Sequence, residues 1–480
     1  MDAPHELPEA QRELELDGAA FRALVERVLP RLEHYLDTLS EQPAWSEGLP
    51  QPTPGLRGGL PEDGRAVDEV LEEIFALLEP EGFHTAGPGY LAYVPGGGLP
   101  ESAVAELIAN LVNRYVGVAV AAPGWARLEA RVVRWLCSLC GFGEGAGGYL
   151  ATGGSMANLS GLVGARQAKL GEELGGGVLY ASDQAHYSVA KSARLAGFPA
   201  RAVRALPTDE RQAIRVEGVA ERIERDRAEG LRPFLLVASA GTTNTGAVDP
   251  LEELAELCAE HGLWLHVDAA YGGAFLLTER GRAALAGIER ADSVTLDPHK
   301  GLFLPYGTGA LLCRRREHLV DAHSATAAYM PAWSDDEEAP DFATLSPELS
   351  REFRGLRLWL PLCLHGAGAF RRALDEKLDL ARWAAGELER LPHVRLLDRP
   401  TLSLFAFYLE PPGLDLEQQN ELNRAWLARA NAPRRFYLTP TTIEGRFVLR
   451  ICVLSFRTHA DRMRECVDTL RETAAELLAS

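Results

Sequence analysis

Short apolar segments alternate with helical patterns between residues 100 and 315, and this alternation restricts the possible folds more than any other feature. The apolar segments are three to five residues long and lie at 178–180, 234–238, 263–267 and 293–296. Short apolar runs separated by helices are typical of strands in a parallel sheet that is covered on both faces. The pattern predicts an α/β domain with a mainly parallel sheet.

One of the connecting helices carries clear start and stop signals. Asp249 is a favourable N-cap, Pro250 occupies the first helical position and Glu252 completes a capping box. Gly262 follows the end of the apolar stripe, as expected at a helix C-terminus. We therefore expect the side chain of Asp249 to have a structural role as a helix cap.

The first 98 residues have a different pattern. Two amphipathic segments, 21–32 and 67–78, flank a connector at 48–55 that is too rich in proline and glycine to be a regular helix. A helical arm that packs on the partner subunit of an oligomer suits this segment, and a small helical domain is the alternative.

The pattern changes again near residue 360. A helical segment at 370–388 leads into alternating segments at 402–409 and 447–454, which predict a smaller α+β unit. We expect three parts, listed here with their boundaries: a helical N-terminal dimerisation segment (1–98), a large domain (99–357) and a small C-terminal domain (358–480).

Composition excludes several classes of protein. The 480 residues are 46% hydrophobic and 24% charged, as in an ordinary globular protein. The 49 basic and 68 acidic residues give a net charge of −19, which opposes binding to nucleic acid and to anionic membranes. No apolar run reaches the ~18 residues of a membrane span. The acidic N-terminus and the seven scattered cysteines indicate a cytoplasmic protein without a targeting segment.

Lys300 is the first candidate for a chemical role. It lies just after the apolar segment 293–296, in a turn bounded by Pro298 and Gly301. Desolvation of such a lysine makes its neutral amine available for Schiff-base chemistry. A surface lysine in a loop is the alternative for this residue taken alone.

Two further features strengthen this interpretation. Asp268 ends an apolar segment and is followed by small residues, so its carboxylate could pair with a pyridinium nitrogen while Ala270 lets a flat ring lie close. The glycine-rich turn at 151–155 precedes a helix whose free N–H groups could bind a phosphate. Taken alone, each feature has a purely structural alternative. Asp268 could be a helix cap or a member of an ion pair, and residues 151–155 could form an ordinary tight turn. A phosphate cradle, a ring-nitrogen carboxylate and a Schiff-base lysine together indicate a pyridoxal phosphate site, and we predict no metal.

The sequence resembles the group II pyridoxal-phosphate decarboxylases, which include aromatic L-amino acid and glutamate decarboxylases. The resemblance extends over nearly the whole chain and rests on six motifs in order, at 89–93, 182–188, 241–243, 266–271, 298–300 and 447–450. It implies a fold-type I enzyme with a mainly parallel seven-stranded sheet flanked by helices, a small α+β C-terminal domain and a helical N-terminal arm. It also implies a homodimer whose active site lies at the subunit interface.

The resemblance assigns roles to individual residues. Lys300 matches the lysine that forms the Schiff base with the cofactor, and Asp268 matches the carboxylate that pairs with the pyridinium nitrogen. His186 matches the imidazole that stacks on the cofactor ring and helps to hold the substrate carboxylate or to protonate the intermediate. Four more residues match positions near the cofactor. They are Thr243, with a hydroxyl near the ring, and the phosphate-binding Gly154, Ser155 and His299.

The resemblance also implies substrate contacts. Tyr329 matches a tyrosine on a mobile loop that donates a proton to Cα after CO2 has left. Tyr93 and Tyr115 lie where the family contacts its substrate and are compatible with an aromatic amino acid. Val94 and Gly117 are smaller than their counterparts in animal aromatic decarboxylases, so we expect a wider pocket.

The leading hypothesis is decarboxylation of an aromatic L-amino acid to its amine. The alternatives are a decarboxylase of an acidic or diamino acid, an aldehyde synthase or aminotransferase, and a non-catalytic interaction protein on the same fold. His186 and Tyr329 favour a decarboxylase, because relatives with phenylalanine at the tyrosine position tend to make aldehydes. Intact Lys300 and Asp268 argue against a non-catalytic protein.

Overall fold

The computed structural model describes residues 12, 14–46, 59–78, 82–325, 332–334 and 336–479. The predicted connector at 48–55 and Tyr329 lie outside these residues. The chain divides into two compact units, Met1–His84 and Thr85–Ser480. The domain boundaries at 98/99 and 357/358 stay predictions.

The first unit contains two helical segments where the sequence predicts them. Helix α1 spans Gly18–Thr38 and begins at Asp17, whose side chain accepts a hydrogen bond from the amide of Ala20 at 2.8 Å. Helix α2 (Val67–Glu72) continues as a π-helical stretch, η2 (Glu73–Leu78).

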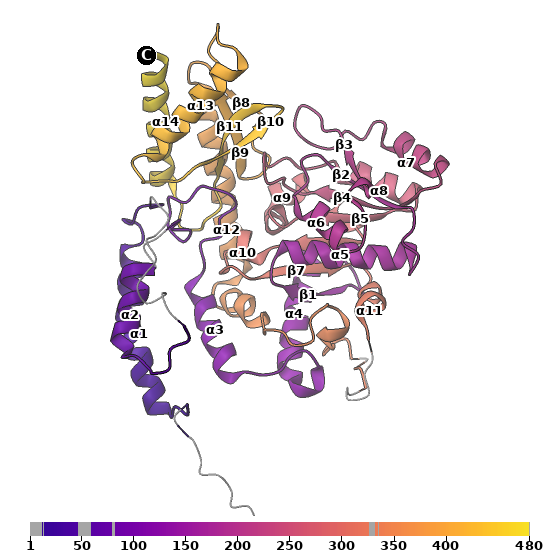
Figure 1. Cartoon of the computed structure of the whole chain (residues 1–480), viewed down its shortest axis with the longest axis vertical. Helices are drawn as coiled ribbons and strands as arrows, with labels where there is room; N and C mark the ends of the chain where they lie inside the picture. The colour runs from indigo at the N-terminus through magenta and orange to yellow at the C-terminus, as the bar shows by residue number, and fades with distance from the viewer. Residues whose placement is uncertain are drawn as a thin grey trace, which may run out of the picture. The chain divides into compact units, whose positions relative to one another are not determined.

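The second unit is built around a seven-stranded sheet with the order β1-β7-β6-β5-β4-β2-β3 (Figure 1). Its strands are β1 (Gly147–Ala151), β2 (Gly177–Ser182), β3 (Val203–Leu206), β4 (Arg232–Ser239), β5 (Trp264–Asp268), β6 (Ser293–Leu296) and β7 (Gly309–Cys313). Strand β7 is antiparallel to both of its neighbours, whereas β6, β5, β4, β2 and β3 pair in parallel. The predicted mainly parallel sheet is confirmed.

Helices cover both faces of this sheet. Side chains alternate along each strand, so Trp264, His266 and Asp268 of β5 face helix α5 (Gly154–Leu170), and Leu265 and Val267 face the opposite core. Helix α5 packs across β1, β4, β5, β6 and β7 (Figure 1). The other helices of this layer system are α3 (Pro100–Val112), α4 (Pro123–Leu139), α6 (Ser188–Leu195), α7 (Val219–Ala228), α8 (Leu251–Glu260), α9 (Glu279–Ala284), α10 (Pro298–Gly301) and α11 (Glu317–His323). Short 3₁₀ helices lie at Ala119–Ala121, Ala200–Ala202, Gly272–Leu277, Ile288–Arg290 and Phe342–Thr344.

A smaller antiparallel sheet follows in the C-terminal part, as predicted. Its order is β10-β11-β9-β8, with strands β8 (Val394–Leu396), β9 (Leu404–Leu409), β10 (Thr439–Ile443) and β11 (Arg446–Cys452). The helices α12 (Gly355–Glu389), α13 (Leu416–Asn431) and α14 (Ala460–Ala479) pack against it around a separate apolar core. Helix α12 is kinked at Gly366, whose φ of 71° is left-handed.

The predicted role of Asp249 is wrong. Helix α8 begins after Pro250, and no side chain caps it. The carboxylate of Asp249 instead accepts hydrogen bonds from the amides of Ile214 at 2.7 Å and Ser239 at 2.6 Å. A long-range bond to the neighbouring strand β4 therefore replaces the local cap, and burial raises the pKa of Asp249 to about 7.

No helix among the residues that the structure describes is both long and apolar enough to span a bilayer.

Candidate active site

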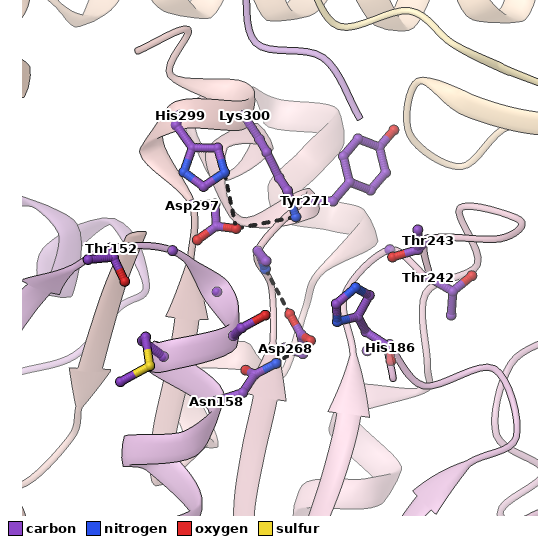
Figure 2. A pocket seen from close by; sticks show the side chains of 17 residues that line it. Thr152, Asn158, His186, Thr242, Thr243, Asp268, Tyr271, Asp297, His299 and Lys300 are labelled. Carbon is purple, nitrogen blue, oxygen red and sulfur yellow. Dashed lines mark hydrogen bonds and ion pairs between the residues drawn. The ribbon is translucent and has the colours of Figure 1, made fainter. Parts of the chain in front are cut away.

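A cavity of about 320 Å³ lies at the carboxyl ends of the parallel strands and the N-terminus of α5 (Figure 2). Strand β5 ends at Asp268, β6 leads to Asp297 and Lys300, and β4 leads to the turn at 241–243. Ligands of open α/β sheets bind at this edge because the loops that follow neighbouring strands meet there. The topology thus brings together residues that are far apart in the sequence.

All eight predicted cofactor residues line this one cavity. They are Gly154, Ser155, His186, Thr243, Asp268, Ala270, His299 and Lys300. Tyr93 and Tyr115 do not line it, and they are 50% and 40% exposed. Tyr329 lies outside the described residues, so its predicted role stays a prediction.

The glycine-rich turn brings main-chain atoms close to the cavity. A Cβ atom on Gly309 of β7 would lie 2.6 Å from the backbone of Gly153, and one on Gly154 would lie 2.9 Å from Oδ2 of Asp297. Helix α5 begins at Gly154, and no described side chain caps it. The amides of Met156 and Ala157 donate to the carbonyl of Gly153, so the N–H groups of Gly154 and Ser155 remain for an anion. The turn therefore offers donors of the kind that a phosphate requires, and its phosphate-binding role stays a prediction.

Asp268 is held with both carboxylate oxygens in defined positions. Oδ1 accepts a hydrogen bond from the amide of Ala270 at 3.1 Å, and Oδ2 accepts one from Nδ2 of Asn158 on α5 at 2.8 Å (Figure 2). The residue is 9% exposed, and the exposed part faces the cavity. Each oxygen keeps a lone pair for a further donor, such as a pyridinium N–H.

Lys300 forms an ion pair inside the cavity. Its Nζ lies 3.2 Å from Oδ2 of Asp297, and Nε2 of His299 lies 3.7 Å from the same oxygen (Figure 2). The other oxygen of Asp297, Oδ1, is buried without a hydrogen-bond partner among the described residues. Asp297 is therefore the carboxylate that pairs with Lys300 inside the cavity.

His186 also lines the cavity, across from the turn that carries Thr152 (Figure 2). Its Nδ1 lies 2.7 Å from Oγ of Ser188. Burial lowers the pKa of His186, and the positive charge of Lys300 lowers it further, against the opposing effect of Asp268 and Asp297. The imidazole is thus neutral at pH 7 and can lie against a flat ring.

The turn at 241–243 is attached to the small sheet by Arg450 of β11. Its guanidinium donates to the carbonyl of Thr243 and, at 2.9 Å, to that of Asn244. Arg450 is 4% exposed, so the bonds form in a buried setting. The motif at 447–450 therefore fixes the turn that carries Thr243.

The predicted cofactor fits this set of residues. The cavity offers a helix N-terminus for a phosphate, Asp268 for a ring nitrogen, and Lys300 for an aldehyde. Ala270 and His186 also line the cavity, and the small side chain of Ala270 takes up little of its space. Buried Asp297 forms an ion pair with the lysine, and its Oδ1 has no hydrogen-bond partner among the described residues.

Three residues of the site were not predicted from the sequence. Asn158 holds Asp268, Ser188 holds His186, and Asp297 pairs with Lys300. A usable signal existed for Asn158, because it lies four residues after Gly154 and so on the same face of α5. Asp297 lies between the apolar segment 293–296 and the motif at 298–300, but no sequence pattern shows which partner its carboxylate has.

Close packing accounts for the glycine at position 117. A Cβ atom there would lie 2.2 Å from the carbonyl oxygen of Leu349 and 3.1 Å from the hydroxyl of Tyr115. The main chain of Leu349 therefore leaves no space for a larger side chain, and the expected wider pocket stays a prediction.

Comparisons with known proteins agree with this geometry. A family model described as the pyridoxal-dependent decarboxylase conserved domain matches residues 52–410. Aromatic-L-amino-acid decarboxylase of Bacillus atrophaeus is 36% identical over 432 residues, which cover 88% of this chain and 89% of that protein. Phenylacetaldehyde synthase of Arabidopsis thaliana is 27% identical over 488 residues, covering 96% and 97%. The crystal structure of Oryza sativa TDC with PLP and tryptamine has a TM-score of 0.91 at 26% identity, and covers 96% of this chain and 99% of that one.

Proposed function

Because this chain belongs to the family of pyridoxal-dependent decarboxylases, we propose that it converts an aromatic L-amino acid to the corresponding amine and CO2. Its cofactor is pyridoxal phosphate. The observation that carries the proposal is the cavity in which Lys300, Asp268 and the N-terminus of α5 converge. The aromatic substrate is inferred from the relatives, which are named for aromatic amino acids and their products.

Bound pyridoxal phosphate supplies an electron sink for the electron pair that is left on Cα when CO2 departs. The chain's own residues have to hold this sink in its protonated form. Asp268 would do so, because its two oxygens are fixed by Ala270 and Asn158 and keep lone pairs that could accept a hydrogen bond from the ring nitrogen.

Lys300 must be a neutral amine before its Nζ can attack a carbonyl carbon. Asp297 Oδ2, at 3.2 Å, can take the proton from Nζ and return it when the lysine is released. The N–H groups at the start of α5 would hold the phosphate of the cofactor, and neutral His186, which also lines the cavity, could lie against its ring.

We propose that Tyr329 donates the proton to Cα, and that His186 contributes a hydrogen bond to the substrate carboxylate. An amino-acid-to-aldehyde synthase is the second candidate, because phenylacetaldehyde synthase is among the relatives. That reaction consumes O2 and yields an aldehyde, so its products differ from those of simple decarboxylation.

We also propose a cytoplasmic homodimer. Apolar side chains on one side of α3 are 42–62% exposed, namely Val104, Leu107, Ile108, Leu111 and Val112. An exposed apolar row of this length is typical of a subunit interface. All seven cysteines are unpaired and six of them are buried, which suits a reducing compartment.

The substrate is tested by incubating the purified chain with pyridoxal phosphate and a panel of amino acids. We expect amine and CO2 in equal amounts from at least one of phenylalanine, tyrosine, tryptophan and dihydroxyphenylalanine, without peroxide. The Lys300→Ala variant should form no amine, and Lys191→Ala, an exposed lysine on α6, should behave as the unmodified protein. Activity only on acidic or diamino acids would refute the aromatic assignment, and aldehyde with peroxide would favour the second candidate.

A further inference from the structure

A buried chain of hydrogen bonds lies behind the cavity, between the sheet and α5. It joins Trp264 and His266 of β5, Ser293 of β6, Asn158 of α5 and Ser188 of α6. From Asn158 it divides, with one branch to Asp268 and the other through Ser188 to His186. Asn158 is 3% exposed and Ser188 is 1% exposed, so solvent does not compete for these bonds.

The direction of the chain follows from the chemistry of its ends. A carboxylate only accepts hydrogen bonds, so the group of Asn158 that lies 2.8 Å from Asp268 Oδ2 must be the amide NH2. The same Nδ2 lies 2.9 Å from Ser188 Oγ and donates to it. The amide oxygen of Asn158 is left to face Nε2 of His266 at 3.1 Å, so His266 carries its proton on Nε2.

The far end of the chain agrees with this direction. Burial lowers the pKa of His266 to about 4, so its ring is neutral and Nδ1 is an acceptor. Ser293 donates its hydroxyl proton to Nδ1 at 2.7 Å, and Ser293 in turn accepts from the indole N–H of Trp264 at 2.8 Å. The indole of Trp264 can only donate and the carboxylate of Asp268 can only accept, so one assignment of donors and acceptors satisfies both ends of the hydrogen-bond chain.

The second branch determines the proton position on His186. Because Ser188 Oγ accepts from Asn158, its own proton is free to bond Nδ1 of His186 at 2.7 Å. The amide of Ser188 points at the same nitrogen at 3.3 Å. A nitrogen that receives two donors carries no proton, so neutral His186 is protonated on Nε2.

We propose that Asn158 is a positioning residue that, through Ser188, fixes His186 in the Nε2–H tautomer while it holds Asp268 as an acceptor. His186 then presents a donor, and Asp268 an acceptor, to whatever the cavity binds. The effect of this tautomer on catalysis rests on the proposed decarboxylation. The assignment of the tautomer does not depend on that proposal. The single amide group of Asn158 thus orients both His186 and Asp268.

The tautomer is measured by nitrogen-15 NMR of the full chain labelled on histidine, with and without pyridoxal phosphate, and His186 is assigned by comparison with His186→Gln. We expect Nε2 to be protonated and Nδ1 unprotonated in His186 already without cofactor. An Nδ1-protonated His186 would overturn the proposal. The NMR measurement does not depend on turnover. An inactive protein with the expected tautomer would therefore refute the proposed function and not this inference.

Two variants separate the branches. Ser188→Ala should give a mixture of His186 tautomers and lower kcat about tenfold or more, with less than about a threefold change in the dissociation constant of pyridoxal phosphate. Asn158→Leu, similar in volume, should also raise that dissociation constant about tenfold or more, because Asp268 loses a donor.

Asn423→Leu is the matched control. Asn423 is a fully buried asparagine on α13 that bonds Leu409 and Gln419 in the small C-terminal core, outside the cavity. Its loss should lower the melting temperature and leave the His186 tautomer and the cofactor dissociation constant unchanged. A folded Ser188→Ala protein that kept a pure Nε2–H tautomer and full kcat would contradict the proposal, as would equal cofactor loss in Asn423→Leu.

Discussion

Burial of uncharged histidines links this protein's stability to pH. His323 at the end of α11 lies with its Nε2 2.7 Å from Ser160 Oγ, and burial lowers its pKa to about 4. A histidine in an unfolded chain has an ordinary pKa of about 6.5. Between these values the unfolded state binds more protons, so the contribution of His323 is complete above pH 6.5 and declines as the pH falls toward 4.

A variant isolates this contribution. His323→Asn cannot titrate, so we expect it to be less stable than the unmodified protein at pH 7 and to lose less stability on acidification. The difference in unfolding free energy should shrink by about 2 kcal/mol between pH 7 and pH 5. Chemical denaturation of both apo-proteins at each pH measures it, and a constant difference would show that folding does not lower the pKa of His323.

The sequence identified the residues that touch the cavity better than those that hold them. Lys300, Asp268 and His186 stand in recognisable motifs, and all three line one cavity. Asn158 and Ser188 were not predicted, because no distinctive sequence pattern surrounds a buried amide or hydroxyl side chain. Its importance depends on which side chain the fold places opposite, and a single sequence does not contain that information.

Among the elements, strand β7 and helix α5 build the phosphate cradle by close contact of their main chains. A side chain on Gly309 would meet the backbone of Gly153 at 2.6 Å, and backbone cannot move aside as a flexible side chain can. We expect Gly309→Ala to raise the dissociation constant of pyridoxal phosphate about tenfold or more, since displacement of the turn costs on the order of 1–3 kcal/mol.

Gly164→Ala is the control for this prediction. Gly164 also lies in α5, but the nearest atom to an added Cβ is a methyl of Leu319 at 3.7 Å, an ordinary contact. Alanine there should leave cofactor binding unchanged and stabilise the helix by about 0.5–1 kcal/mol. Titration of each apo-protein with pyridoxal phosphate makes the comparison, and equal affinities of the two variants would contradict it.

The element-level prediction succeeded where periodicity decides and failed where long-range contacts decide. Strands β2, β4, β5 and β6 contain the predicted apolar segments, apart from one residue just before the start of β5, because burial on both faces leaves a local signal. The antiparallel insertion of β7 between β1 and β6 has no such signal. The capping prediction for Asp249 failed for the same reason, since the amides of Ile214 and Ser239 compete for its carboxylate.

For the whole molecule, the exposed apolar row on α3 is the feature on which the proposed homodimer rests. Leu111, at 62% exposure, is its most exposed member. We expect Leu111→Asp to convert a dimer to a monomer, because a charge would have to be buried without a counter-ion in the interface. Light scattering coupled to size-exclusion chromatography gives the mass directly.

Leu416→Asp controls for the change in charge and hydropathy. Leu416 is 42% exposed at the start of α13, on a different element from the apolar row. This variant should keep the mass of the unmodified protein. A Leu111→Asp protein that remained dimeric would place the subunit interface elsewhere.

The central claim is that Lys300 binds pyridoxal phosphate in the cavity at the carboxyl ends of the strands. The chain has four lysines, Lys169, Lys191, Lys300 and Lys377, so reduction of the loaded protein with borohydride followed by peptide mass spectrometry gives a clear answer. Lys169 donates to the carbonyl of Gly262 and Lys377 pairs with Glu376, both outside the cavity. We predict one phosphopyridoxyl group per chain, on Lys300. Its attachment to another lysine, or its absence, would contradict the account.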